Sequence, residues 1–220
     1  MFGIVNYAGF LAATVMLCLT PGIDTIYILT RSMAGGRGEG VASALGINTG
    51  LLVHTVLVAT GLSLVLASSP VAFTVLKVAG AVYLVVMGIR SVLSHESVLG
   101  TDVAAGGAGE AGADGTSRSS LKTYGQGVLT NVLNPKIILF FLALLPQFVA
   151  VPNGFGPLPF LLLGLTYTVI STIWTLVLVL ISSPFARLLR RSERAGRATN
   201  VVSGIVYMLL GGMVFVTSRS

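Results

Sequence analysis

The segment LCLTPGIDTIYILT, at Leu17–Thr30, interrupts an apolar run with a proline and places a carboxylate beside the interruption. Pro21 removes a helix hydrogen bond and frees the carbonyl four positions earlier, that of Leu17. Gly22 lets the backbone deviate further and lets a ligand approach it closely. Asp24 follows within the same run. The segment therefore predicts a broken membrane helix with an acidic side chain at the break.

The segment VLNPKIILFFLALLPQF, at Val132–Phe148, repeats this arrangement with the opposite charge. Pro135 frees the carbonyl of Asn131, Asn134 adds an amide, and Lys136 stands in place of the acid. Unpaired backbone groups in a membrane must find partners, so a broken helix lines a cavity or packs inside the protein. The segment therefore predicts a second helix break, with a basic side chain.

The composition of the whole chain indicates an integral membrane protein. Of 220 residues, 54% are apolar and 9% are charged, whereas soluble domains contain about 25% charged residues. The net charge of +6 lies in loops between apolar runs, so it indicates membrane topology and no nucleic-acid partner. The single cysteine, Cys18, excludes an internal disulfide. The first ten residues lack the cationic start of a signal peptide, so we expect the first apolar run to stay as a membrane helix.

Six apolar spans are long enough to cross a bilayer, which takes about 20 residues each. We therefore predict an all-α integral membrane protein with six transmembrane helices. Three spans per half require the second half to run inverted through the membrane, and the LTP and LNP motifs occupy the first span of each half. This predicts a 3+3 inverted repeat with a Pro-broken first helix in each half, which is typical of transporters. The spans cover residues 4–30, 41–67, 71–93, 124–150, 158–182 and 199–217.

The loops between the spans predict the domain organisation and the orientation. The two three-helix repeats cover residues 1–94 and 123–220, and a Gly- and Ala-rich linker at 95–122 joins them. Lys and Arg occur in the first, third and fifth loops, and the second and fourth loops contain neither. The positive-inside rule then places the linker in the cytoplasm and both termini outside.

Charged and polar side chains inside the spans are the candidate functional residues. Asp24 and Lys136 are the only ionisable groups well inside the first and fourth spans, where an unpaired charge costs a few kcal/mol. They form either a buried ion pair that holds the halves together, or a shared cavity that binds the two ends of a zwitterion. Asp24 is also the first proton-coupling candidate. Asn48, Thr49 and His54 lie on nearby turns of the second span, and His54 is either a second proton carrier or a hydrogen-bonded packing residue.

Other ligands and contacts are also predictable. Two histidines and no second membrane carboxylate are too few ligands for a transition-metal site, so we expect no metal and no cofactor. Glycines repeat at a spacing of four residues, as Gly36 with Gly40 and Gly46 with Gly50. This spacing predicts close contact between helices.

Two parts of the chain resemble the LysE/RhtB family of amino-acid exporters. They are TPGIDTIYILTRSMAGGRGEGVASALGINTGLLVHTVLVATGLS, at Thr20–Ser63, and LNPKIILFFLALLPQFV, at Leu133–Val149. The length, the six spans and the basic third loop also fit, so the resemblance covers nearly the whole chain. It implies a multi-pass exporter of an amino acid or close derivative in the bacterial inner membrane, driven by the proton gradient.

The resemblance also implies site residues. The family's Pro-Gly-Pro-Asp pattern corresponds to Pro21, Gly22, Ile23 and Asp24, where Ile23 departs from the second proline and leaves the geometry of the break open. Its Asn-Pro-Lys pattern corresponds to Asn134, Pro135 and Lys136. The expected substrate-binding residues are therefore Pro21, Gly22, Asp24, Asn48, Thr49, Asn134, Pro135 and Lys136.

The expected mechanism uses both charges. Asp24 attracts the substrate ammonium or carries the proton, whereas Lys136, Asn134 and the helix start after Pro135 hold the carboxylate. The alternatives are an exporter of an inorganic cation or another small solute on the same scaffold, and a non-transporting membrane subunit. An enzyme or electron carrier is not expected, because the chain lacks a CxxC pair, paired histidines for haem and an acid cluster. The exported solute and a homo-oligomeric state stay open.

Overall fold

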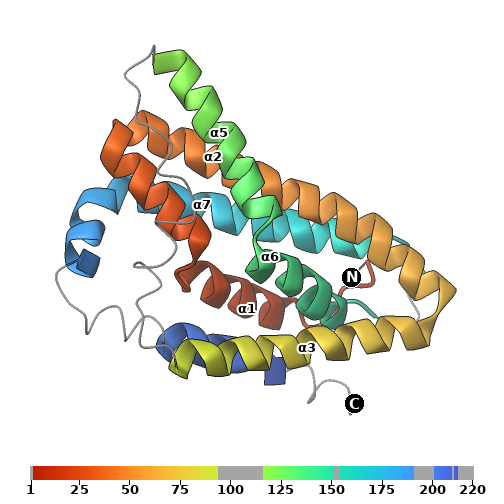
Figure 1. The fold of residues 1–220 in the computed structure, drawn as a ribbon. Coiled ribbons are helices and arrows are strands. Elements are labelled where there is room, and N and C mark those ends of the chain that lie inside the picture. The colour runs from red at the N-terminus through yellow and green to blue at the C-terminus, as the bar shows by residue number, and fades with distance from the viewer. Residues whose placement is uncertain (1, 94–115, 151–153, 191–200, 210, 213–220) are drawn as a thin grey trace.

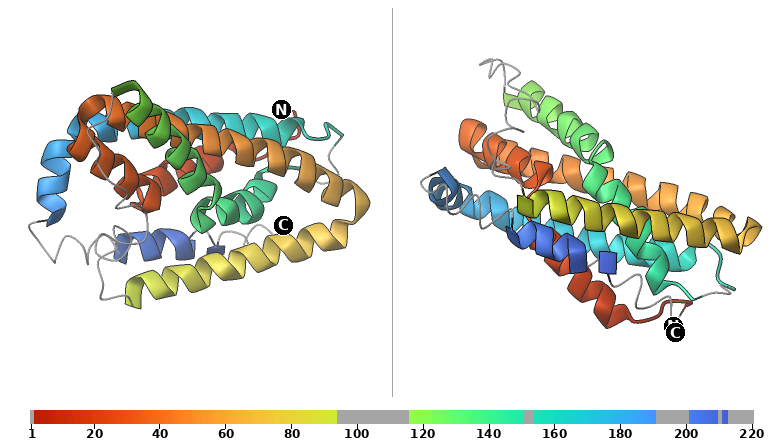
Figure 2. Two further views of the ribbon diagram at one scale, coloured as in Figure 1. Left: turned by 45° about the horizontal axis from the view of Figure 1, so that its top comes forward. Right: turned by 60° about the horizontal axis from the view of Figure 1, so that its bottom comes forward.

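The described part of the chain is helical and folds as one bundle. The computed structural model describes residues 2–93, 116–150, 154–190, 201–209 and 211–212. In Figure 1, and in the left view of Figure 2, α1 and α6 lie between α3 on one side and α2 with α7 on the other. The prediction of an all-α protein is confirmed for these residues. The helices are α1 (Tyr7–Leu19), α2 (Ile23–Ser68), α3 (Pro70–Leu93), α5 (Thr116–Val132), α6 (Pro135–Leu139), α7 (Leu158–Arg190) and a further helical stretch at 201–209.

Membrane-crossing helices are present in the described residues. Ile23–Val65 and Leu158–Ser182 are each long and apolar enough to cross a bilayer. The bent pair formed by Ser119–Val132 and Pro135–Phe148 is a third candidate. The prediction of a membrane protein therefore agrees with the fold, whereas the number of six spans stays a prediction.

The first predicted loop is not a loop. Residues 31–40 are helical and belong to α2, which has one non-helical residue inside it, Gly36 at φ 78° and ψ −171°. Such a positive φ is unfavourable for residues other than glycine. A bend at one residue therefore separates the first two predicted spans, and Figure 1 shows α2 changing direction there.

The other predicted connections differ in how well they match. α2 ends at Ser68 and α3 begins at Pro70, so a short connection separates the predicted spans 41–67 and 71–93 as expected. The predicted linker at 95–122 ends early, because α5 already begins at Thr116. Residues 94–115 lie outside the described part of the chain.

Both proline breaks are confirmed. α1 ends at Leu19, just before Pro21, and α2 begins at Ile23. α5 ends at Val132 and α6 begins at Pro135, where the missing N–H costs no helix hydrogen bond. After α6 the chain continues as a π-helical turn over 140–144 and a 3-10 turn over 145–148.

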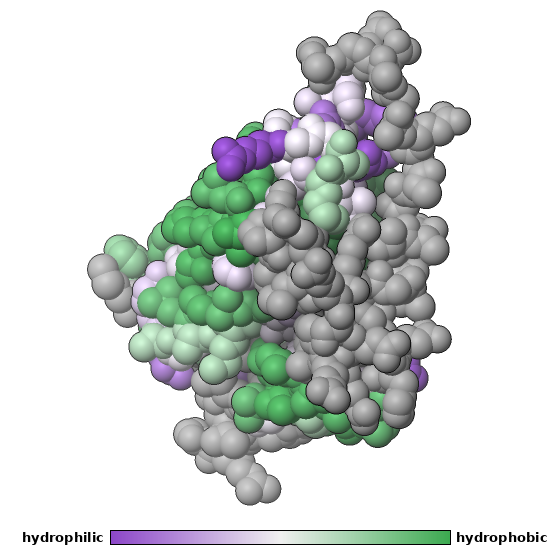
Figure 3. All heavy atoms as spheres, turned by 90° about the vertical axis from the view of Figure 1, so that its left-hand side faces the viewer, coloured by the Kyte–Doolittle hydropathy of each residue, from purple (hydrophilic) through white to green (hydrophobic). Residues whose placement is uncertain are grey.

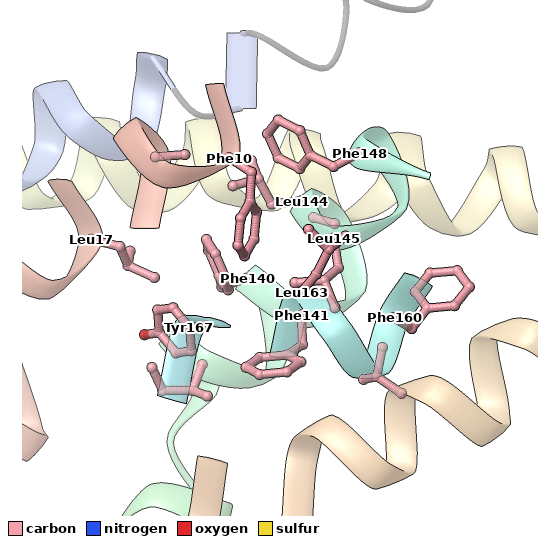
Figure 4. Close-up of a cluster of buried hydrophobic side chains, with 14 of the residues drawn as sticks. Phe10, Leu17, Phe140, Phe141, Leu144, Leu145, Phe148, Phe160, Leu163 and Tyr167 are labelled. Atoms are coloured by element: carbon pink, nitrogen blue, oxygen red, sulfur yellow. The ribbon is translucent and has the colours of Figure 1, made fainter. Parts of the chain in front are cut away.

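This irregular segment is enclosed by the hydrophobic core. Its large side chains are essentially fully buried and contact α1 and α7, as Figure 4 shows. Backbone of this kind is tolerated at membrane depth only when protein surrounds it. The core therefore explains how a broken helix survives in an apolar chain. Its buried side chains include Phe10, Leu17, Phe140, Phe141, Leu144, Leu145, Phe148, Phe160, Leu163 and Tyr167.

The outside of the bundle is apolar, as a lipid-facing surface requires. In Figure 3 hydrophobic residues gather on the left side and at the lower edge of the view, and hydrophilic residues gather mainly near the top. Contiguous exposed apolar surface of this extent is rare in soluble monomers. The strongly exposed hydrophobic residues include Leu57, Leu64, Val71, Val75, Val169, Ile173 and Leu180.

Glycines bring α2 and α5 into direct contact. A Cβ atom on Gly46 would lie 2.2 Å from the carbonyl oxygen of Tyr124, and one on Gly50 would lie 2.7 Å from Cβ of Asn131. The prediction of close packing is confirmed for this pair. Gly36 differs, because a Cβ atom there would meet nothing within 4 Å, and its role is the bend.

Gly46→Ala is expected to destabilise the protein by roughly 1–3 kcal/mol. The new methyl group meets backbone, which cannot rotate away as a side chain can. Gly61→Ala on the same helix is the matched control, because its Cβ meets nothing within 4 Å and alanine favours helix by up to about 1 kcal/mol. Thermal unfolding in detergent measures both variants. An unchanged midpoint for Gly46→Ala would contradict the close contact.

Candidate functional site

Lys136 joins the second break to the first. Its Nζ donates to the carbonyl oxygens of Thr20, at 2.7 Å, and Leu17, at 3.2 Å. The Leu17 carbonyl is the group that Pro21 was predicted to free. A cation is favourable at the C-terminus of a helix, and Lys136 is only 9% exposed. Lys136 therefore caps the broken end of α1.

Asp24, which lies at the first break, binds side chains at the second break. Its Oδ2 accepts from Nδ2 of Asn131 at 2.9 Å, and its Oδ1 accepts from Nδ2 of Asn134 at 3.0 Å. Both amides are almost fully buried. A buried carboxylate is costly unless it is hydrogen-bonded. Each break thus supplies the partners of the charge that the other break carries.

The hydrogen bonds of the two charges go to different groups. Asp24 binds two amides and Lys136 binds two carbonyls, yet both side chains line one cavity. This arrangement favours the shared-cavity interpretation over a hydrogen-bonded ion pair.

The cavity is small in this conformation. Its volume is about 30 Å³, which is room for one or two water molecules. Sites for small molecules usually measure about 300–1,000 Å³. The cavity as it stands is too small for an amino acid, so binding of one requires the cavity to widen.

α7 forms a wall of this cavity that the sequence interpretation missed. Tyr167, Ser171, Trp174 and Thr175 line the cavity and follow one another at helical spacing, so they share one face of α7. Tyr167 also stacks on Phe140 at 4.9 Å between ring centroids. Neither a charge nor a proline marks this stretch. The available signal was a polar stripe at period 3.6 in an apolar span.

Asn48 and Thr49 are not among the residues that line the cavity. Asn48 lies behind its wall, where Nδ2 donates to Oγ1 of Thr175 at 3.0 Å. Thr49 accepts from the hydroxyl of Tyr124 at 3.0 Å and faces α5. Asn48 therefore supports the wall from outside, whereas Thr49 joins α2 to α5.

Of the remaining predicted residues, the glycine lines the cavity, whereas the two prolines only interrupt the helices. Gly22 lines the cavity, and a Cβ atom there would lie 3.5 Å from Nζ of Lys136. Pro21 and Pro135 create the two breaks and are not among the lining residues. The amides of Lys136, Ile137 and Ile138 at the start of α6 all bind Asn134. The helix start that we expected to hold a carboxylate is therefore already capped.

His54 contacts the second break from outside the cavity. Its Nε2 lies 3.2 Å from the carbonyl oxygen of Asn131, the group that Pro135 was predicted to free. The imidazole is buried, with its centroid 5.8 Å from that of Phe141. This geometry suits a packing residue, and proton transfer by His54 stays a prediction.

Comparison with known proteins identifies the family of this chain. The family model for LysE type translocators matches residues 15–218. The chain is 30% identical over 205 residues to the homoserine/homoserine lactone efflux protein of Salmonella typhimurium, covering 93% of each chain. It is 29% identical over 210 residues to the leucine efflux protein of Klebsiella pneumoniae, covering 94% of this chain and 93% of that one. An uncharacterized membrane protein of Bacillus subtilis, YrhP, is 29% identical over 196 residues, covering 89% and 91%.

No solved structure matches the chain. The family match covers both proline breaks, the two charged side chains and the α7 wall. The chain therefore belongs to the family of LysE type translocators.

Proposed function

We propose that the protein exports an amino acid or a close derivative across the bacterial inner membrane. The observation that carries this proposal is that Asp24 and Lys136 line the same cavity. A zwitterion needs an anionic and a cationic partner at short range, and this cavity offers both. The names of two relatives, which describe efflux of homoserine or its lactone and of leucine, support the same substrate class.

Binding exchanges internal partners for substrate. The ammonium group takes the place of the Asn131 and Asn134 amides at Asp24. The carboxylate takes the place of the Leu17 and Thr20 carbonyls at Lys136. Because these contacts also hold the two breaks together, binding loosens them and lets the cavity open. The substrate thereby couples its own binding to the movement of the broken helices.

Proton exchange supplies the driving force in this mechanism. Protonation of Asp24 from the outside weakens its attraction for the ammonium group and releases the substrate there. Deprotonation toward the cytoplasm restores the site. Six spans in two inverted repeats would expose the cavity to each side in turn. An inorganic cation is the less suitable cargo, because Lys136 lines the cavity and repels it.

The proposed orientation follows from the basic loops and can be measured. Gly38→Cys and Gly154→Cys, each in a Cys18→Ala background, place single thiols where a side chain meets nothing within 4 Å. We expect an impermeant maleimide to label the cysteine at 154 in intact cells. The cysteine at 38 should react only after the cells are opened. The reverse pattern would overturn the orientation and the direction of the proton cycle.

Purified protein in liposomes loaded with the twenty common amino acids and homoserine tests the function. With an acidic exterior, we expect loss of at least one amino acid faster than from protein-free liposomes. Collapse of the pH gradient should slow that loss. Retention of every amino acid would reject the proposal.

A further inference from the structure

One atom in the cavity wall lacks a partner. The described residues include several buried side-chain polar atoms without a hydrogen bond, and all but one are oxygens. The exception is Nε1 of Trp174, and Trp174 lines the cavity with Asp24 and Lys136. An indole N–H only donates, and a buried donor without an acceptor is destabilising.

The neighbouring side chains leave this donor unpaired. Oγ1 of Thr175 donates to the carbonyl of Thr172 at 3.1 Å and accepts from Asn48 at 3.0 Å. The indole packs against a mainly apolar cluster on α2 and α7, whose one polar side-chain group, the Tyr27 hydroxyl, donates to the carbonyl of Thr123. No acceptor for Nε1 is found among these side chains, and Trp174 lines the cavity, so we look for the acceptor in whatever fills the cavity.

The two charged groups already account for the ends of an amino acid. Asp24 takes the ammonium group and Lys136 takes the carboxylate, so the side chain of the substrate is what remains for the α7 wall. That wall also contains Ser171, one helical turn before Trp174 and Thr175. It is thus a polar surface, unlike the fully apolar pocket that a branched aliphatic side chain prefers.

We propose that Trp174 donates a hydrogen bond to an oxygen in the side chain of the exported amino acid. The preferred substrate is then a small amino acid with a hydroxyl or carbonyl oxygen, such as homoserine or its lactone, rather than an aliphatic one. This inference rests on the proposed function. A site that hydrogen-bonds a substrate hydroxyl rejects the analogue lacking it, because the site's own donor is left unpaired.

The wild-type protein reports on this contact directly, because Trp174 is its only tryptophan. Homoserine should shift the indole emission to longer wavelength in a saturable way, since the N–H gains an acceptor. Norvaline, which carries a methyl group in place of the hydroxyl, should bind at least about tenfold more weakly and cause no such shift. Equal responses to homoserine and norvaline would overturn the proposal.

Trp174→Phe provides the second measurement, in liposomes. The variant should lose the preference for homoserine over norvaline, so that the ratio of half-saturation concentrations falls about tenfold. Thr172→Val is the matched control, because this residue lies on α7, is not among the cavity-lining residues and binds only the Thr168 carbonyl through its side chain. It should keep the wild-type ratio.

The outcomes separate the two proposals. An unchanged ratio in Trp174→Phe would overturn the role of Trp174 and leave amino-acid export intact. If Trp174→Phe does not fold, the emission of the wild-type protein decides. Export of no amino acid by the wild-type protein would instead reject the proposed function, and this inference with it.

Discussion

Asp24→Asn is expected to abolish export driven by a pH gradient, reducing it to the rate of protein-free liposomes. The amide resembles a permanently protonated acid, so the site cannot load and release a proton. Exchange of labelled for unlabelled substrate at equal concentrations needs no net proton movement and should persist in part. Export and exchange measured on the same liposomes separate proton coupling from binding. Equal loss of both activities would mean that Asp24 only anchors the ammonium group.

The structure explains why this variant should still fold. Asn131 donates its Nδ2 to Asp24, and its own Oδ1 has no partner. Rotation of the Asn131 amide by half a turn presents that oxygen to the new amide and restores a hydrogen bond. The same rotation suits a protonated Asp24, which donates where the carboxylate accepts. Asn131 can therefore serve both protonation states.

Glu39→Gln is the matched control for Asp24→Asn. Glu39 is another carboxylate on α2, and it accepts hydrogen bonds from Ser120 and Thr123 outside the cavity. Its neutralisation should leave gradient-driven export measurable. If Asp24→Asn exports as fast as the wild type, Asp24 has no part in the mechanism, and His54 becomes the remaining candidate for the proton carrier.

Lys136→Met is expected to destabilise the protein by roughly 3–5 kcal/mol and to abolish export. The apolar side chain leaves the Leu17 and Thr20 carbonyls without their donor and leaves the partly buried Asp24 without the cation that shares its cavity. A large fall of the thermal midpoint in detergent measures the first effect. A midpoint near that of the wild type would contradict the role of Lys136 as the cap of α1.

The double substitution Asp24→Asn with Lys136→Gln separates structure from transport. It removes both charges and keeps hydrogen-bonding groups at each break. We expect it to recover most of the stability that Lys136→Met loses and none of the export. Export at the wild-type rate would show that the two charges serve only to hold the fold.

The sequence predicts the breaks and the charges well because both are local signals. A proline ends a helix wherever it lies in the interior, and a charge in an apolar run must have a partner. The first loop was predicted wrongly because its glycines and charges resemble a turn, whereas one residue, Gly36, makes the bend and the rest stays helical. The π-helical and 3-10 turns after α6 depend on tertiary packing and have no such local signal.

The candidate site was only half predictable for a related reason. Asp24, Asn134 and Lys136 stand beside prolines, and the structure brings them together. Pro135 draws attention only to the carbonyl of Asn131, although the side chain of Asn131 also binds Asp24. Asn48 and Thr49 are adjacent in sequence but lie about 100° apart around a helix, so they have different neighbours and neither is among the cavity-lining residues.

Protection of Cys18 by substrate tests most directly whether this cavity binds the exported amino acid. Cys18 lines the cavity and is the only cysteine in the chain, so a permeant maleimide in liposomes reports on one position. A saturating concentration of the exported amino acid should slow its modification several-fold. Leu64→Cys with Cys18→Ala places the thiol at a strongly exposed apolar position, where substrate should have no effect. Modification of Cys18 at the same rate with and without saturating substrate would contradict the assignment of the cavity as the transport site.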